Sequence, residues 1–100
     1  MSYYVYVILC KDNSFYTGYT KDLDLRMRLH MNGKAARYTR MHRPKKIVYV
    51  EELGSRAEAM RREKSVKRLN HRQKLKLINS QKKAKTKFKR LKNHQASAHT

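Results

Sequence analysis

Three groups of side chains in this sequence have types and spacings that could do chemistry together. The first is a set of tyrosines between residues 3 and 20, whose hydroxyl groups need polar partners wherever they are buried. The second is Arg26 with His30, four residues apart and therefore on one face of a helix. The third is Glu63, an acid within a basic segment. If buried, Arg26 must be paired or must bind an anion, and Glu63 could bind a metal ion.

Each group also has an ordinary structural explanation. The tyrosines could be sheet aromatics whose hydroxyl groups reach solvent. Arg26 could extend its charged end to water along a narrower apolar stripe, and His30 taken alone is better explained as a core residue. Glu63 could form a buried salt bridge, most simply with Arg26.

The tyrosines fall in a predicted β-hairpin. Residues 3–10 are apolar and rich in β-branched side chains, which predicts a strand buried on both faces. Residues 11–14 suit a turn, and residues 15–20 then form the partner strand. Gly18 within that strand predicts a bulge, or a close approach by another backbone or a ligand.

Arg26 and His30 fall in a helix predicted over residues 21–32, which Asp22 could cap and which Gly33 would help to end. On a helical wheel the pair lies in the middle of an apolar arc. The arc is lined by Leu23, Leu25, Met27, Leu29 and Met31.

A second helix is predicted from Ser55 to about residue 69. Ser55 and Glu58 form a capping box, in which each side chain accepts a hydrogen bond from a backbone amide at the helix start. Glu58 could also pair with Arg62, four residues further along. Glu63 lies within the buried arc of this helix, which is formed by Ala59, Met60, Val66 and Leu69.

The segment between the first helix and the third strand is dense in basic residues. Residues 33–46 are predicted as a loop, and residues 47–53 as the third strand. A solvated loop does not require so many cations in a short span, which favours contacts with phosphate groups. The candidate nucleic-acid-binding residues are Lys34, Arg37, Tyr38, Arg40, Arg43, Lys45 and Lys46.

The remaining residues complete a small domain. A third helix is predicted from residue 70 to about residue 80. Residues 81–100 are too basic and too poor in apolar groups to fold alone, so we expect a flexible tail or a frayed helical extension. The domain over residues 1–80 then has the order β-β-α-β-α-α, an α+β fold with a small three-stranded antiparallel sheet flanked by helices.

The charge of the chain indicates its class of partner. Lys and Arg total 26 against 7 Asp and Glu, a net charge of +19 over 100 residues, which implies a polyanionic partner. Nucleic acid is the first candidate. An anionic membrane surface is the second, but no basic amphipathic segment has the bulky aromatic face that such binding favours. No obligate protein partner can be inferred.

Several other classes of protein and site are excluded. No apolar run has membrane-spanning length and no export signal is present, so we expect a cytoplasmic protein. The single cysteine, Cys10, excludes an internal disulfide and is expected to be a buried structural thiol. The sequence shows no zinc-ligand spacing, no glycine-rich phosphate loop and no nucleophile elbow.

Several short segments resemble, in order, those of the GIY-YIG nuclease superfamily, specifically its small single-domain members. Tyr4-Val5-Tyr6 stands where the family has Gly-Ile-Tyr, and Tyr16-Thr17-Gly18 stands where it has Tyr-Ile-Gly. The run from Thr20 to Arg26, with His30 one turn later, resembles the helix that carries the family's arginine. Tyr4 and Thr17 depart from the motifs, but both are strand positions at which we expect little effect.

Two later segments extend this resemblance, which covers about residues 3–79. Residues 36–39 with Arg43-Pro44 resemble the branch that includes a structure-specific junction nuclease. Residues 59–63 resemble the segment with the family's metal-binding glutamate.

The resemblance implies hydrolysis of a phosphodiester with one divalent cation, Mg²⁺ or Mn²⁺. Glu63 would hold the ion, with water and substrate oxygens completing its coordination. Arg26 would hold the nonbridging phosphate oxygens. Tyr6 or Tyr16 would accept a proton from the attacking water, and His30 would orient a tyrosine hydroxyl or share that role. An ordinary tyrosine has a pKa of about 10, so nearby positive charge would have to lower it.

We therefore interpret the chain as a metal-dependent endonuclease-like protein acting on nucleic acid. DNA is favoured over RNA, and branched, nicked or damaged DNA is the candidate substrate. The alternative is a non-catalytic nucleic-acid-binding protein on a nuclease fold, and association with RNA or the ribosome is also compatible with the charge. The nuclease is preferred because binding alone would not require an inward glutamate in so basic a protein.

Overall fold

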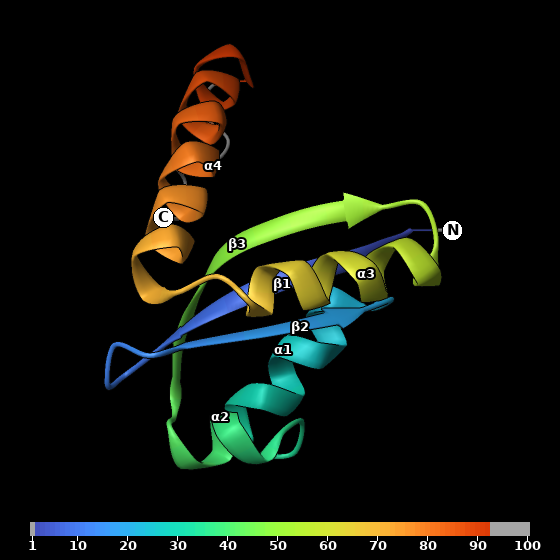
Figure 1. The fold of residues 1–100 in the computed structure, drawn as a ribbon, viewed down its shortest axis with the longest axis vertical. Helices are drawn as coiled ribbons and strands as arrows, with labels where there is room; N and C mark the ends of the chain where they lie inside the picture. The colour runs from blue at the N-terminus through green and yellow to red at the C-terminus, as the bar shows by residue number, and fades with distance from the viewer. Residues whose placement is uncertain (1, 93–100) are drawn as a thin grey trace. The chain divides into compact units, whose positions relative to one another are not determined.

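The computed structural model describes the backbone of residues 2–92 and the side chains of residues 2–81 (Figure 1). The chain divides after Asn70 into two compact units, and α4 belongs to the second. None of the helices between residues 23 and 92 is both long and apolar enough to cross a membrane. The elements, in order, are β1 (Tyr3–Cys10), β2 (Phe15–Thr20), α1 (Leu23–Met31), α2 (Arg37–Met41), β3 (Pro44–Leu53), α3 (Arg56–Lys67) and α4 (His71–Lys92).

The three strands form one antiparallel sheet in the order β2-β1-β3, which confirms the predicted α+β fold. The central strand, β1, is buried without interruption from Val5 to Ile8, as expected for a strand covered on both faces. Its register with β2 places Tyr6 opposite Gly18 and Ile8 opposite Tyr16.

The side chains of β1 alternate between the two faces of the sheet. One face carries Tyr6, Ile8 and the buried Cys10, and it packs against residues of α1 and α2. Those residues include Met27 and Tyr38. The third helix of the unit, α3, packs against β1 and β2 (Figure 1). The candidate side chains therefore come from the sheet and from helices that pack on it.

The predicted turn and helix starts form as the local chemistry requires. Asn13 adopts a φ of 70° in the hairpin turn, a left-handed conformation that asparagine tolerates. The Leu25 N–H donates to the Asp22 carboxylate at 3.1 Å, so Asp22 caps α1. The Glu58 N–H likewise donates to the Ser55 hydroxyl at 3.2 Å.

Of two details predicted for the start of α3, one is confirmed and one is wrong. The Glu58 carboxylate reaches back, as predicted, to a backbone amide at the helix start, where it accepts a hydrogen bond from the Gly54 N–H at 3.1 Å. The predicted Glu58–Arg62 pair is replaced by a contact of 2.7 Å between Arg62 Nε and the Glu51 carboxylate. Arg62 thus joins α3 to β3 across the domain instead of bridging two turns of one helix.

The segment predicted as a loop over residues 33–46 differs from the structure. It contains the short helix α2, so the first unit has one more helix than predicted. The third strand begins at Pro44, three residues earlier than predicted, where a proline is tolerated as the first residue of a strand. The last helix, α4, continues past residue 80 to Lys92, while residues 93–100 of the predicted tail lie outside the described residues.

The apolar arcs of the helices are narrower than predicted. Ala59 and Val66 of α3 are buried, but Met60 is 39% exposed because its position turns toward solvent. Leu25 and Met31 of α1, predicted in the buried arc, are 44% and 59% exposed. The buried face of α1 is centred on His30, with Leu23 and Met27 partly buried beside it and packed against the core.

Candidate active site

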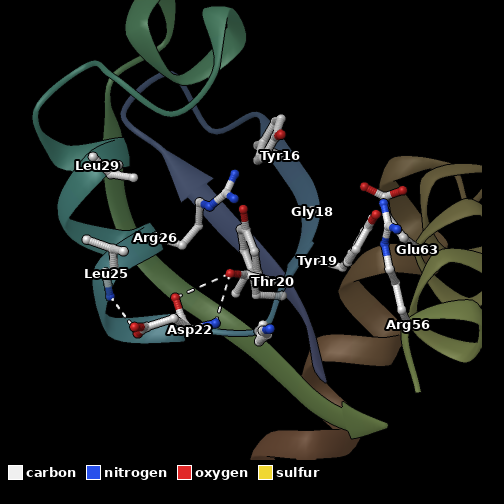
Figure 2. Close-up of a pocket in the computed structure, with 12 residues that line it drawn as sticks. Tyr16, Gly18, Tyr19, Thr20, Asp22, Leu25, Arg26, Leu29, Arg56 and Glu63 are labelled. Carbon is white, nitrogen blue, oxygen red and sulfur yellow. Dashed lines mark hydrogen bonds between the residues drawn. The ribbon is translucent and has the colours of Figure 1, made fainter. Parts of the chain in front are cut away.

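A cleft of about 520 Å³ opens between β2, α1 and α3. Four residues singled out by the sequence line it, namely Tyr6, Tyr16, Arg26 and Glu63. Figure 2 shows Arg26 extending from α1 on one side and Glu63 from α3 on the other, with residues of β2 between them. Residues separated by almost 60 positions in the sequence therefore meet at one concave surface.

The start of α1 sets the position of Arg26. The Asp22 amide donates to the Thr20 hydroxyl at 3.1 Å, which ties the helix start to the last residue of β2. The Asp22 carboxylate then caps the helix through Leu25 (Figure 2). Arg26 follows one turn later and points into the cleft.

Tyr6, at the wall of the cleft, forms a buried hydrogen-bonded pair with His30, which lies behind it. Each side chain is 1% exposed, and the Tyr6 hydroxyl lies 2.8 Å from His30 Nε2. The other ring nitrogen, Nδ1, lies 2.7 Å from the hydroxyl of Thr39, which is fully buried. His30 therefore contacts the candidate tyrosine directly, in addition to being a core residue.

Burial and charge keep the His30 ring neutral. Loss of solvent around the imidazole, with the nearby Arg26 guanidinium as a second cause, lowers the pKa of His30 from 6.5 to about 4. At neutral pH only one ring nitrogen then carries a proton.

This lowered pKa predicts a pH-dependent stability. In the unfolded chain His30 becomes protonated as the pH falls below about 6.5. In the folded chain it becomes protonated only near pH 4. The free energy of unfolding should therefore be highest above about pH 6.5 and should decrease toward about pH 4, by up to about 3 kcal/mol from this residue. Urea unfolding across this range would measure the slope, and the variant His30→Gln should show a shallower one. Equal slopes in the two proteins would contradict the assignment.

The absence of a side chain at Gly18 leaves room for the ring and hydroxyl group of Tyr6. A Cβ atom at this position would lie 2.5 Å from the Tyr6 hydroxyl oxygen and 2.8 Å from the ring carbon that carries it. The sequence predicted a bulge or a close approach by a backbone or a ligand, whereas the approaching group is a tyrosine side chain. Any larger residue here would displace the Tyr6 hydroxyl from His30.

Tyr16 lies at the centre of a cluster of rings. Its ring centroid is 6.4 Å from that of Tyr6, 5.1 Å from that of His30 and 5.9 Å from that of Tyr38. Desolvation raises the pKa of Tyr6 and of Tyr16, although Arg26 acts on both in the opposite direction. In the unliganded protein burial therefore outweighs the charge of Arg26, and the lowered tyrosine pKa that the general-base role requires would depend on a bound ion.

Glu63 contacts a lysine at the edge of the cleft. Its carboxylate lies 3.4 Å from Nζ of Lys67, one turn further along α3, and its side chain is 17% exposed. The described residues show no contact between Glu63 and Arg26 within salt-bridge distance, so the alternative of a buried pair between them is not realised. The carboxylate stays accessible from the cleft.

The side chains around Glu63 limit the kind of metal ion that could bind. Among residues 2–81 no group of three or more His, Cys, Asp and Glu side chains lies close enough to hold an ion. A closed protein cage is therefore not formed there. One carboxylate on an open cleft fits Mg²⁺ or Mn²⁺ that keeps water and takes its other oxygens from a substrate.

The predicted nucleic-acid-binding residues divide into two kinds. Tyr38 is only partly exposed, and its ring stacks on those of Tyr16 and His42 at centroid distances of 5.9 and 4.1 Å. His42 is fixed in turn by the Asp12 carboxylate at 2.6 Å. The six cations are exposed, and they are Lys34, Arg37, Arg40, Arg43, Lys45 and Lys46.

Three residues near the cleft were not singled out by the sequence. Lys67 lies beside Glu63, and its positive charge opposes the rise in the pKa of Tyr16. Its spacing of four residues from Glu63 was a sequence signal that could have identified it. Arg56 is hydrogen-bonded to the Tyr19 hydroxyl at the cleft wall. Thr39 gave no signal, because nothing in a basic segment marks one threonine as buried.

Comparisons with known proteins identify the family and the fold of this chain. A family model described as the GIY-YIG catalytic domain matches residues 2–76. A UPF0213 protein of Staphylococcus haemolyticus is 50% identical over 76 residues, which cover 76% of this chain and 93% of that relative. The solution NMR structure of a UPF0213 protein from Bacillus halodurans matches with a TM-score of 0.52 and 47% identity, covering 79% of this chain and 84% of that one. An NMR structure from E. faecalis matches with a TM-score of 0.57 and 36% identity, covering 80% and 85% of the two chains.

Proposed function

Because this chain belongs to the GIY-YIG catalytic-domain family, we propose that it is an endonuclease that hydrolyses phosphodiester bonds in nucleic acid with one divalent cation. The family is of nuclease type, and nucleic acid is the substrate class that it implies. The observation that carries the proposal is the cleft that holds Tyr6, Tyr16, Arg26 and Glu63 together. We take DNA, branched, nicked or damaged, as the first substrate to test and the cytoplasm as the predicted location.

Arg26 would bind the phosphate. Its guanidinium is permanently charged and planar, and it can donate two parallel hydrogen bonds to nonbridging oxygens. It reaches into the cleft from α1, opposite Glu63 (Figure 2). A phosphate between the two side chains would be held by the arginine and would keep one side open to Glu63.

Glu63 would hold Mg²⁺ or Mn²⁺ together with water and phosphate oxygens. The bound ion would supply stabilisation of the negative charge that develops on the leaving oxygen. Lys67 neutralises Glu63 in the unliganded protein, since their charged groups lie 3.4 Å apart. This surface contact between neighbouring turns is weak, so a divalent ion could displace the lysine.

Tyr6 and His30 would remove the proton from the attacking water as a pair. The water proton would move to the Tyr6 hydroxyl oxygen while the Tyr6 proton moves to His30 Nε2, 2.8 Å away. This route does not require a free phenolate, which the raised pKa of Tyr6 makes costly. A bound phosphate would offset the Arg26 charge that helps to lower the His30 pKa, so substrate binding would make His30 a better acceptor.

The six exposed cations between residues 34 and 46 would hold the flanking nucleic acid by its phosphates. Such contacts are independent of sequence and depend strongly on salt. They fit a nuclease that recognises the shape of its substrate.

The proposal is tested with labelled substrates incubated with the purified protein. The panel comprises single-stranded, duplex, nicked and branched DNA and structured RNA, each with Mg²⁺, with Mn²⁺ or with EDTA. A protein with both Arg26→Ala and Glu63→Gln, purified identically, controls for contaminating nucleases. We expect divalent-dependent cutting of at least one DNA by the native protein alone. Tight, salt-dependent binding without cutting of any substrate would overturn the proposal in favour of a non-catalytic binding protein.

A further inference from the structure

We infer that Thr39 is a positioning residue of this site: its hydroxyl group fixes which nitrogen of His30 carries the proton, and thereby the direction of the hydrogen bond between His30 and Tyr6. The hydrogen-bond assignment follows from the contacts of Thr39 together with the neutral state of the His30 ring. Its catalytic consequence rests on the proposed nuclease function.

The contacts of Thr39 determine its role toward His30. Its hydroxyl oxygen lies 3.3 Å from the Ala36 carbonyl oxygen and 2.7 Å from His30 Nδ1. A carbonyl oxygen can only accept, so the threonine hydroxyl donates its one hydrogen to Ala36. Toward His30 the hydroxyl oxygen then accepts, and Nδ1 must carry the proton.

The protonation state of the second ring nitrogen of His30, Nε2, follows from that of Nδ1. The ring is neutral, so with a proton on Nδ1 its Nε2 holds a lone pair. That lone pair accepts a hydrogen bond from the Tyr6 hydroxyl at 2.8 Å. All hydrogen bonds in the series then run in one direction, from Tyr6 through His30 and Thr39 to the Ala36 carbonyl.

The reverse arrangement satisfies fewer groups. If Thr39 donated to Nδ1, its hydroxyl group would no longer bond the Ala36 carbonyl, which would keep only its hydrogen bond from the Arg40 N–H. The protonated Nε2 would donate to Tyr6, whose own hydrogen would have to point away from His30. Because all three side chains are at most 1% exposed, unused hydrogen-bonding groups are costly here.

The tautomer decides whether the pair can accept a proton. With Nε2 unprotonated, Tyr6 can pass its hydrogen to His30 as it takes one from water. With Nε2 protonated, His30 has no acceptor facing Tyr6, and this route is closed. The short helix α2 thus has a definite use, since it returns a buried threonine to the ring of His30 nine residues earlier in the chain.

The experiment is a comparison of Thr39→Val with Thr39→Ser. Valine has nearly the shape of threonine without its hydroxyl, and serine keeps the hydroxyl. Nitrogen-15 NMR of the imidazole rings distinguishes protonated from unprotonated nitrogens, and it is recorded at neutral pH without metal or nucleic acid. We expect a protonated Nδ1 in the native protein and in Thr39→Ser. In Thr39→Val we expect a mixture of tautomers or the opposite one.

The cleavage assay then measures the consequence. On a substrate that the native protein cuts, Thr39→Val should lower kcat by about 10-fold or more with little change in KM, and Thr39→Ser should recover most of the loss. A protonated Nε2 in the native spectrum would overturn the inference even if Thr39→Val does not fold. An unchanged tautomer in folded Thr39→Val would overturn it as well. If the native protein cuts nothing, the proposed function fails while the NMR result still decides the tautomer.

Discussion

The variant Glu63→Gln should lose divalent-dependent cleavage, by about 10³-fold or more. Glutamine has nearly the shape of glutamate but no charge, and it cannot replace the one carboxylate that faces the cleft from α3. Charge stabilisation by a bound ion is worth several kcal/mol in the transition state, which corresponds to this loss. Cleavage rates of native and variant protein, measured over a series of Mg²⁺ and Mn²⁺ concentrations, check the expectation.

The same substitution should change stability little. The contact of Glu63 with Lys67 joins neighbouring turns of a helix at the surface, and such pairs contribute less than about 1 kcal/mol. Binding of nucleic acid in EDTA should also persist. A matched control is Glu52→Gln, which removes an exposed carboxylate that contacts Ser2 outside the cleft. If Glu63→Gln cleaves at the native rate, Glu63 has no role in the mechanism. If Glu63→Gln and Glu52→Gln lose cleavage activity equally, the loss is a general effect of charge.

The variant Arg26→Ala should lower kcat by about 10²- to 10³-fold, the usual cost of removing one preorganised group that stabilises transition-state charge. Arg26→Lys should recover only part of this activity, because an ammonium group lacks the planar pair of donors that fits a phosphate. Arg28→Ala is the matched control, since Arg28 is exposed on the same helix.

A readout that does not depend on cleavage accompanies this prediction. The Arg26 charge helps to lower the pKa of His30, so removing that charge should raise the pKa of His30. Histidine titration by NMR on Arg26→Ala would show it, and Arg28→Ala should leave the His30 pKa unchanged. A His30 pKa that does not move in Arg26→Ala would place the guanidinium too far from the ring for the proposed arrangement.

The parts of the fold with strong local patterns could be predicted from the sequence. The hairpin has a continuous apolar strand rich in aromatic and β-branched residues and a turn in which Asn13 adopts a left-handed φ. The starts of α1 and α3 are marked by Asp22 and Ser55, whose side chains bond the expected amides. In contrast, α2 has five residues, no apolar period and a cap at Ala36 without a side-chain hydrogen bond, so no local signal indicated it.

The candidate site could be predicted as a set of residues but not as a geometry. Spacing on a helix placed Arg26 and His30 on one face, and that spacing does not tell which residue reaches the cleft. Arg26 lines it, while His30 lies behind Tyr6, because the register of β1 and β2 leaves an open position at Gly18 for the tyrosine. Such tertiary contacts depend on how elements pack, and the same holds for Thr39.

The use of the acidic residues within the fold has a consequence for how the protein behaves in solution. Almost every acidic side chain already contacts a basic side chain, a hydroxyl group or a backbone amide inside the domain. Few carboxylates therefore remain to balance the exposed lysines and arginines. The basic surface must therefore be neutralised by mobile counterions, whose release makes binding to a polyanion favourable in entropy. The protein should copurify with cellular nucleic acid at low salt and shed it at high salt. The acids with such contacts are Asp12, Asp22, Glu51, Glu52, Glu58 and Glu63.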